Sequence, residues 1–343
     1  MGLSARWLSN FPWEMISGLT DKIFSIRSEE EFLSLVFEVF DYQKNNNKVL
    51  KEFTRGLGCF DKLTRSLRDL SFLPVEFFRN RKVITGTKPE KVIFSSSSTT
   101  GTVPGRHFVQ DPAVYETSFY TSFRLFYGDP GKYIIAALLP SYVEREDSSL
   151  VYMADRLIKM SNHYLSGFYK GKQGDLQGLV KKAADSGRQL LLLGVSFALL
   201  DLAEDLITDL SGVIVMETGG MKGRRKEITR AELHSILKEK LNISAVHSEY
   251  GMTELLSQAY SKGDGIFYCP PWMRIVIRDP QDPLTIIDEP GKTGGINIID
   301  LANINSCSFI ATGDLGRMHE DGGFEVLGRF DNSDIRGCNL MAV

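Results

Sequence analysis

Residues 91–107 read Lys-Val-Ile-Phe-Ser-Ser-Ser-Ser-Thr-Thr-Gly-Thr-Val-Pro-Gly-Arg-His, and the rest of the chain is organised around this stretch. Its first four residues are mostly apolar and predict a short strand that enters a turn. Six hydroxyl residues follow, Ser95 to Thr100, and Gly101 closes the run. A polyphosphate needs several hydrogen-bond donors and little side-chain bulk between itself and the backbone. The loop therefore indicates an anion site.

A Ser/Thr-rich surface turn or a flexible linker would have the same composition. The strand before the loop and the ordered-looking Pro104-Gly-Arg-His107 after it argue against a linker. Pro104 and Gly105 would stiffen and turn the exit, and Arg106 and His107 would bring positive charge near the anion. The loop is not a Walker loop, because the glycine spacing and the Gly-Lys-Ser/Thr ending are both missing.

Length and composition are those of an ordinary globular protein. The chain has 343 residues, 43% of them hydrophobic, and a formal net charge of −3. That length allows one large domain or two ordinary ones, and that charge gives no electrostatic reason to expect nucleic acid. No apolar run approaches the ~20 residues of a membrane span, and the first residues lack the shape of a signal peptide. We therefore expect a cytoplasmic protein.

The four cysteines, Cys59, Cys269, Cys307 and Cys338, contain no CxxC pair. This spacing suggests neither a zinc site nor a disulfide framework.

The first ninety residues predict helices that pack and carry no chemistry. Apolar residues recur at helical spacing from Asp21 to Tyr42, and Ser28 with Glu31 forms a capping-box pattern for the main helix. A polar break at 44–48 precedes a second helical stretch that continues to Leu67.

Strands and helices alternate after the hydroxyl loop. Helix signals cover 111–126, 153–165 and 197–206, and apolar strand candidates cover 132–139, 190–194 and 212–216. This alternation is typical of an α/β domain with a largely parallel sheet, in which ligands bind beyond the carboxyl ends of the strands. Gly219-Gly220 lies at such an end, where the backbone could approach a ring or a phosphate. A plain strand-to-loop turn is equally compatible with this glycine pair.

Two acidic turns complete the set of candidate motifs. Residues 245–254 predict a strand that enters a tight turn and presents Tyr250-Gly-Met-Thr-Glu254. Beside a phosphate loop, Glu254 would be a suitable Mg²⁺ ligand, although a helix-capping Thr-Glu pair has the same pattern. Thr312-Gly-Asp314 could hold a ribose diol or be an ordinary loop. The strand predicted at 324–331 ends in Arg329 and Asp331.

In this order, the motifs resemble those of the adenylate-forming superfamily of acyl-CoA synthetases and adenylation domains. Ser96–Gly101 is similar to its phosphate loop, and Tyr250–Glu254 matches its Tyr-Gly-x-Thr-Glu motif. Thr312–Asp314 matches the ribose-binding Thr-Gly-Asp motif of the superfamily, and Gly328–Asp331 matches its hinge motif. Gly219-Gly220 lies where the superfamily has glycines that contact adenine. The resemblance implies an α/β fold with mixed and parallel sheets flanked by helices, and ATP and Mg²⁺ as cofactors.

The resemblance also implies roles for individual residues. Glu254 would hold the metal, and Arg106 and His107 would stabilise phosphate charge. Two positions depart from the family pattern: Ser98 stands where the loop usually has Gly, and Arg106-His107 stand near a usual Lys. ATP would be bound by Ser96, Ser97, Ser98, Thr99, Thr100, Gly101, Gly219, Gly220, Tyr250, Gly251, Met252, Thr253, Asp314 and Arg329.

A narrower resemblance is to the acyl-protein synthetases of bacterial bioluminescence. It is carried by Arg106-His107, by 193–197 and 216–223, and by the ending Ile335-Arg-Gly-Cys-Asn-Leu340. That family passes an acyl group from acyl-AMP to a cysteine near the C-terminus and then to a reductase, and Cys338 is the matching position. A thiolate is a good nucleophile for this transfer, and neighbouring Arg336 would lower the pKa of the thiol. The other interpretation is a buried cysteine in a last strand.

The expected protein is thus an ATP-dependent ligase that activates a fatty acid and transfers it to a protein cysteine, with a reductase or another acyl-acceptor protein as partner. We expect helical residues 1–90, an adenylate-forming core at 91–326, and a hinge-like segment with a short tail at 327–343 in place of a C-terminal lid domain. Two alternatives stay open. Coenzyme A or another separate acceptor could take the acyl group, or the fold could bind acyl-AMP without catalysis.

Overall fold

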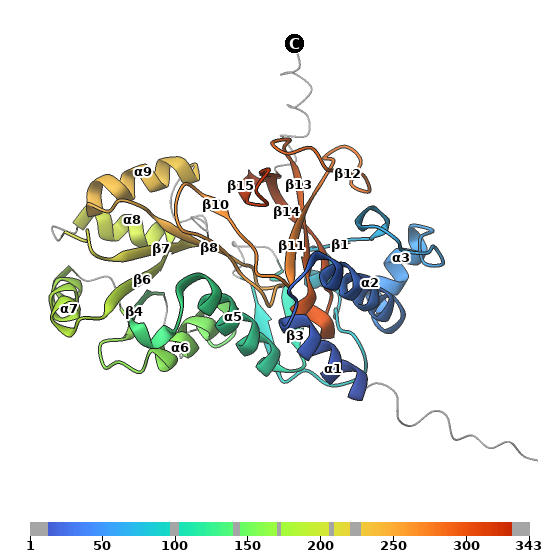
Figure 1. Ribbon diagram of the computed structural model, residues 1–343, viewed down its shortest axis with the longest axis horizontal. Coiled ribbons are helices and arrows are strands. Elements are labelled where there is room, and N and C mark those ends of the chain that lie inside the picture. Colours follow the sequence, from blue (N-terminus) through green and yellow to red (C-terminus); the bar gives the residue numbers. More distant parts are fainter. Residues whose placement is uncertain are drawn as a thin grey trace, which may run out of the picture.

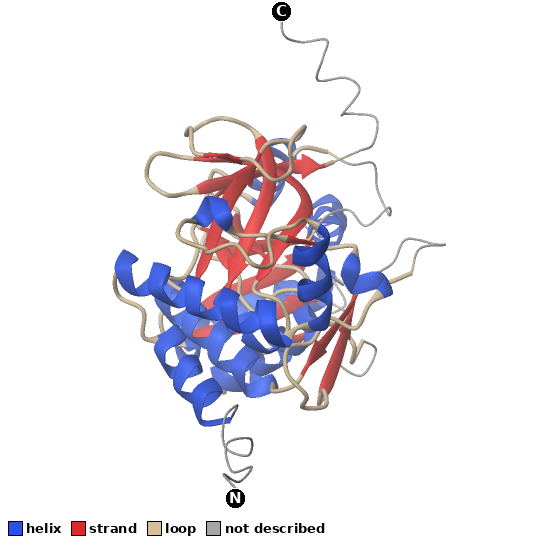
Figure 2. Cartoon of the chain, turned by 90° about the vertical axis from the view of Figure 1, so that its right-hand side faces the viewer, coloured by secondary structure: helices blue, strands red, loops and turns tan. Residues whose placement is uncertain are grey.

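The computed structural model describes residues 13–96, 103–139, 145–169, 173–205, 209–219 and 228–330. It is a mixed α/β fold with two principal sheets that lie side by side (Figure 1). The predicted fold class is confirmed. Figure 2 shows the helices gathered at one end of the molecule and around the strands.

The first sheet is largely parallel. Its order is β5-β4-β6-β7-β8-β9, and only β9 runs antiparallel to its neighbour. The strands are β4 (Tyr133–Leu138), β5 (Gly167–Phe168), β6 (Gln189–Val195), β7 (Ile214–Thr218), β8 (His247–Tyr250) and β9 (Ala259–Ser261).

Helices cover both faces of this sheet. Leu191 and Leu193 of β6 belong to the same core as residues of α5 (Pro112–Tyr127) and α6 (Ser149–Ser161). Leu190 and Leu192 point the other way, into a core shared with α7 (Gln173–Ser186), α8 (Ser196–Asp205) and α9 (Arg230–Leu241). Because both faces are buried, the strand is a continuous leucine run and does not alternate with polar residues.

The second sheet is mainly antiparallel, in the order β10-β15-β14-β13-β11-β12, with β1 added in parallel to β14. The strands are β1 (Leu73–Pro74), β10 (Ile266–Phe267), β11 (Met273–Arg278), β12 (Ile286–Ile287), β13 (Gly294–Asp300), β14 (Phe309–Met318) and β15 (Phe324–Arg329). A separate hairpin pairs β2 (Val92–Ser95) with β3 (Arg106–Val109), the two strands that flank the hydroxyl loop.

The N-terminal helices lie beside this second sheet (Figure 1). They are α1 (Trp13–Phe24), α2 (Glu29–Asn46), α3 (Lys48–Gly56) and α4 (Phe77–Asn80). Three short 3₁₀ turns are η1 (Leu67–Asp69), η2 (Pro130–Lys132) and η3 (Leu301–Asn305). Ser28 caps α2 as predicted, since its side chain accepts a hydrogen bond from Glu31 N at 3.2 Å.

The predicted break within 44–48 is present but narrow, because α2 continues to Asn46 and Asn47 alone separates it from α3. Asn47 accepts hydrogen bonds from Val49 N and Leu50 N, and so starts α3 at once. The predicted extent of the second helix is wrong. The second helix does not reach Leu67, since Gly58 takes a left-handed conformation with φ +66°.

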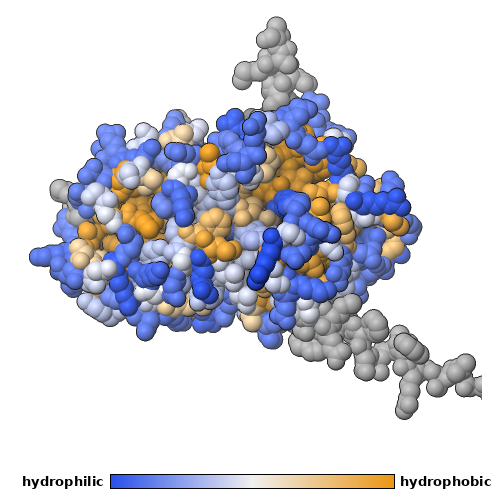
Figure 3. Space-filling model, viewed as in Figure 1, coloured by the Kyte–Doolittle hydropathy of each residue, from blue (hydrophilic) through white to orange (hydrophobic). Residues whose placement is uncertain are grey.

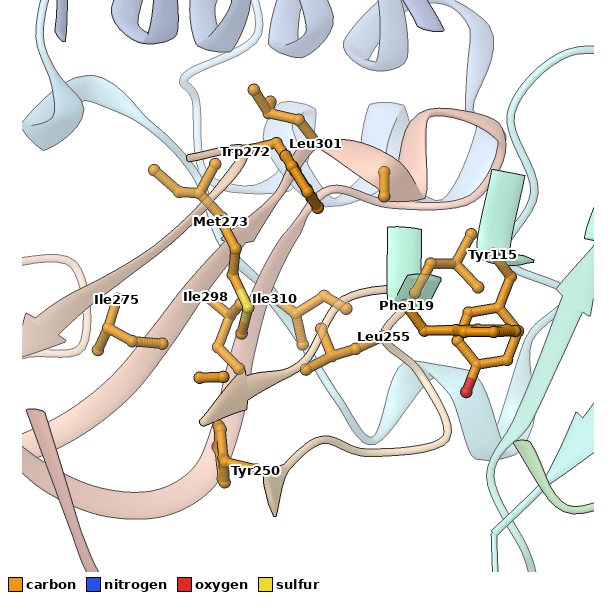
Figure 4. Close-up of a cluster of buried hydrophobic side chains, with 14 of the residues drawn as sticks. Tyr115, Phe119, Tyr250, Leu255, Trp272, Met273, Ile275, Ile298, Leu301 and Ile310 are labelled. Atoms are coloured by element: carbon orange, nitrogen blue, oxygen red, sulfur yellow. The ribbon is translucent and has the colours of Figure 1, made fainter. Parts of the chain in front are cut away.

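One large core joins the two sheets. In Figure 4, Tyr115 and Phe119 of α5 lie on one side, and Trp272 lies on the other with Met273 and Ile298 of the second sheet. The Trp272 indole lies within hydrogen-bonding distance of Ser118 Oγ (3.2 Å) and Ser257 Oγ (3.0 Å), so its polar atom is satisfied inside the core.

Hydrophilic residues cover most of the face seen in Figure 3, with apolar residues showing between them. Among the described residues, no helix is both long and apolar enough to cross a bilayer.

Candidate active site

The predicted motifs meet where the two sheets adjoin. Tyr250 ends β8 of the parallel sheet, and Asp314 lies on β14 of the antiparallel sheet. The Tyr250 hydroxyl donates a hydrogen bond to Asp314 Oδ2 at 2.8 Å. Burial, and secondarily the charge of Asp314, raise the pKa of Tyr250 well above its ordinary value, so the phenol keeps its proton. The bond joins the Tyr-Gly-x-Thr-Glu motif to the Thr-Gly-Asp motif.

The hinge motif reaches the same carboxylate. Arg329 is paired with Asp314 across β14 and β15, and its Nε lies 3.5 Å from Asp314 Oδ1. Phe330 N donates to Gly313 O at 2.8 Å, which extends the pairing by one residue. The Arg329 side chain is 83% exposed, so it can turn to a ligand at little cost. Asp331, the last residue of the motif, lies outside the described residues.

The two ends of the hydroxyl loop are held together. Ser96 N donates to Gly105 O at 2.9 Å, and Gly105 N donates to Ser96 Oγ at 2.8 Å. The residues between them that were predicted to bind phosphate, Ser97, Ser98, Thr99, Thr100 and Gly101, lie outside the described residues. The hairpin β2–β3 therefore defines where this loop begins and ends.

Glu254 lies directly against this loop stem. A Cβ atom at position 105 would collide with Glu254 Oε1, so the carboxylate fills the space that glycine leaves. Glu254 is buried, and this burial raises the pKa of its carboxyl group. One carboxylate beside the hydroxyl loop fits Mg²⁺, which takes few protein oxygens and leaves the rest of its shell to phosphate and water.

His107 does not supply the positive charge expected of it. Its side chain is completely buried on β3, its Nδ1 lies 2.9 Å from Thr253 O, and Phe78 packs edge-on against its ring. Burial lowers the pKa of His107 to about 4, so the ring is neutral at pH 7. Through its contact with Thr253 O, His107 holds the backbone one residue before Glu254. Arg106 is exposed, with its guanidinium 5.4 Å from the Phe108 ring centroid, and can still reach an anion.

The remaining predicted residues lie close to these groups. Gly251 is packed against Glu249, because a Cβ at position 251 would overlap Glu249 Oε1. Met252 is partly buried against the core. Gly219 follows β7 with φ +63°, a conformation that favours glycine, and its carbonyl oxygen lies 2.5 Å from Ser196 Oγ. Gly220 lies outside the described residues.

Two residues that hold the site were not found from the sequence. Buried Arg278 donates from Nη1 to Asn297 Oδ1 at 2.8 Å and from Nη2 to Thr312 O at 2.5 Å. It therefore supports the Thr-Gly-Asp segment, which was predicted as a turn and is part of strand β14. Asn303 Nδ2 donates to Glu254 O at 2.8 Å. For Arg278, the sequence signal was an arginine at the end of the mainly apolar run 273–278.

Cys338 lies outside the described residues, and two of the described cysteines, Cys269 and Cys307, do not fit the role predicted for it. Cys307 is fully buried, and burial raises the pKa of both Cys269 and Cys307 to about 12. Thiols with such a pKa are protonated at pH 7 and poorly nucleophilic.

Solved structures share this architecture. An ATP-bound RpMatB-BxBclM chimera, B1, is 16% identical over 69% of this chain and 47% of its own, with a TM-score of 0.52. A second ATP-bound chimera, B3, is 16% identical over 71% of this chain and 49% of its own, with a TM-score of 0.53. The fold is that of the adenylate-forming N-terminal domain. The chain spans about half the length of these two structures. No family model matches it, and no curated protein does either.

Proposed function

We propose that this protein is an ATP-dependent ligase that activates a carboxylic acid, a long-chain fatty acid by the resemblance of its motifs. The observation that carries the proposal is the meeting of Tyr250, Asp314 and Arg329 at one point, with Glu254 packed against the stem of the hydroxyl loop. These residues come from segments up to 233 positions apart, counting from Ser96 to Arg329. Packing alone gives no reason for them to converge.

In the proposed reaction, a carboxylate oxygen of the acid attacks the α-phosphorus of ATP, and the bond from that phosphorus to the pyrophosphate oxygen breaks. The products are acyl-AMP and pyrophosphate. Bound Mg²⁺ would neutralise phosphate charge, with Glu254 as its protein ligand. Catalysis then consists of positioning and electrostatic stabilisation, since no covalent bond to the protein forms in this step.

Each group of residues has one task. Ser96–Gly101 bind phosphate through hydroxyl and backbone donors, and Arg106 adds positive charge. Gly219-Gly220 contact adenine, while Asp314 and Arg329 fix the ribose. Tyr250 keeps Asp314 in place through its hydroxyl, and His107 keeps Glu254 in place through Thr253 O.

In the second step the thiolate of Cys338 attacks the acyl carbonyl carbon, and AMP leaves. The thioester remains activated, so a reductase or another acyl-acceptor protein can take the acyl group from it. The protein would act in the cytoplasm. The support for Cys338 is its sequence context, Ile335-Arg-Gly-Cys-Asn-Leu340.

The test incubates the full chain with ATP, Mg²⁺ and a radiolabelled long-chain fatty acid in the absence of coenzyme A. We expect acid-dependent ATP–pyrophosphate exchange and hydroxylamine-labile label on the peptide that contains Cys338. Cys338→Ser should keep the exchange and lose the label. If the wild type shows ATP–pyrophosphate exchange but no acyl label on the protein, the acyl acceptor is coenzyme A or another molecule. Without exchange for any acid tested, the protein would be a binding protein and the proposal would be wrong.

A further inference from the structure

A buried carboxylate lies on the opposite face of β7 from the core that α5 and α6 share. The Glu217 side chain is 2% exposed, and burying an ionised carboxylate is costly unless it is paired and hydrogen-bonded. Arg230 Nε lies 2.9 Å from Glu217 Oε1, and Ser196 Oγ lies 3.2 Å from Oε2. Desolvation by itself would raise the pKa of Glu217, but nearby His234, with Nε2 3.7 Å from Oε1, and the charge of Arg230 lower it below its ordinary value.

Arg230 extends this ion pair to the other sheet. Its Nη1 donates to Val326 O of β15 at 3.0 Å, and its guanidinium lies 4.9 Å from the Phe267 ring centroid on β10. Arg230 is the first residue of α9, where a cation opposes the helix dipole. The helix dipole therefore does not explain an arginine at this position. The contacts of Arg230 with Glu217 and β15 explain it.

Ser196 extends the same chain of contacts in the other direction. It is the first residue of α8, and its Oγ lies 2.5 Å from Gly219 O as well as near Glu217. The hydroxyl has one hydrogen, which it shares between these two acceptors. The contacts thus run from Gly219 O through Ser196, Glu217 and Arg230 to Val326 O without a gap.

We propose that Ser196, Glu217 and Arg230 are positioning residues that hold the Gly219 backbone at a fixed separation from β15. The inference rests on the proposed function, in which Gly219 contacts adenine and Arg329, three residues after Val326, contacts ribose. These two halves of the nucleotide site lie on different sheets. A nucleotide that contacts both binds best when their separation is preorganised.

Steady-state kinetics test the effect on ATP. Ser196→Ala removes the hydroxyl hydrogen that Glu217 and Gly219 O share, and should raise the KM for ATP by about fivefold. Arg230→Gln removes the ion pair and the bond to β15 and should raise it by roughly 10- to 100-fold. The KM for the acid should change less than twofold in both variants. Arg230→Lys keeps the charge beside Glu217 and should recover part of the loss.

Thr229→Ala is the matched control. Thr229 caps the same helix, and its side chain accepts a hydrogen bond from Glu232 N at 3.2 Å, but it lies outside the chain of contacts. This variant should lower Tm and leave the KM for ATP unchanged. If Ser196→Ala and Arg230→Gln lower Tm in the same way with an unchanged ATP KM, the contacts are structural only and the proposal is wrong.

Amide hydrogen exchange gives a second readout that needs no activity. Arg230→Gln should speed exchange in both 214–219 and 324–330, Ser196→Ala only in 214–219, and Thr229→Ala only in α9. Absence of acid-dependent pyrophosphate exchange in the wild type would refute the proposed function. The amide hydrogen exchange of the variants would then still show whether these residues hold the two segments together. Unchanged amide exchange rates in 214–219 would overturn the positioning role.

Discussion

Gly105, which has only a hydrogen as its side chain, leaves room for the Glu254 carboxylate beside the stem of the hydroxyl loop. Any larger side chain would need the space that the Glu254 carboxylate occupies, and its Cβ would also lie 3.4 Å from Ser96 Oγ. Gly105 takes no left-handed φ, so the requirement for glycine comes from this close approach alone.

Gly105→Ala should therefore lose activity without unfolding. A displacement of Glu254 or Ser96 by about 1 Å is expected to reduce acid-dependent pyrophosphate exchange by roughly 100-fold. Circular dichroism and Tm check that the variant is folded. Gly178→Ala in α7, where a Cβ would have nothing within 4 Å, should keep wild-type exchange. Equal exchange rates in the two variants would contradict the role given to Glu254.

At the scale of elements, the hairpin β2–β3 is tied to the turn after β8 by His107. The ring is neutral in the folded protein because its pKa is about 4, compared with an ordinary value of 6.5. A base whose pKa is lowered on folding stabilises the fold fully above pH 6.5, and this contribution is lost as the pH falls towards 4. The shift corresponds to roughly 3 kcal/mol.

His107→Gln should flatten this pH dependence. The urea midpoint of the wild type should fall steadily between pH 6.5 and pH 4, and that of the variant should fall less. A slope that is unchanged in His107→Gln would mean that other groups cause the acid sensitivity.

Elements with a regular pattern could be predicted from the sequence. The strand run at 190–194 and the helix at 111–126 correspond to β6 and α5. The short strands β10 and β12 have two residues each, too few for any periodicity to indicate them. Leu57–Leu67 has helical spacing, but the left-handed Gly58 ends the helix, and the spacing could not show that.

The site was predicted as motifs, and the contacts between them needed the structure. Tyr250, Asp314 and Arg329 could be selected because each lies in a short pattern of its own. Arg278 and Glu217 lie in ordinary strand sequences, and their partners are distant in the chain. Their roles follow from tertiary contacts, which residue spacing does not encode.

At the scale of the whole molecule, the N-terminal helices support the site through η3. Gln43 of α2 is fully buried, and its Nε2 lies 2.9 Å from Asn303 O and 3.0 Å from Ile304 O. Its Oε1 accepts a hydrogen bond from Ser308 N at 2.9 Å. Asn303 in turn donates to Glu254 O. The helices visible beside the second sheet in Figure 1 are thus two side chains away from Glu254.

Gln43→Leu should destabilise the whole protein. It leaves Ser308 N without its acceptor and removes the Gln43 donor from Ile304 O and from Asn303 O, which keeps a bond from Ser306 N, at an expected cost of about 2–4 kcal/mol. Chemical denaturation measures the loss, and the transition should remain single because the helices share the large core. Gln177→Leu on the exposed surface of α7 should change stability by less than about 0.5 kcal/mol. A loss of helix signal before the main transition would show that the N-terminal helices unfold separately.

The contact between Gln43 and Asn303 spans 260 positions of sequence. A ribosome adds about 5–20 residues per second, so α2 leaves it roughly 10–50 s before its partner is synthesised. During that interval α2 can pack against α3, but the part of its apolar side that η3 covers in the folded protein stays exposed. Such long-range closure also slows the final search for the native topology. Newly made chains should therefore depend on chaperones more than their size suggests, and yield in a cell should fall when translation is slow and chaperones are scarce.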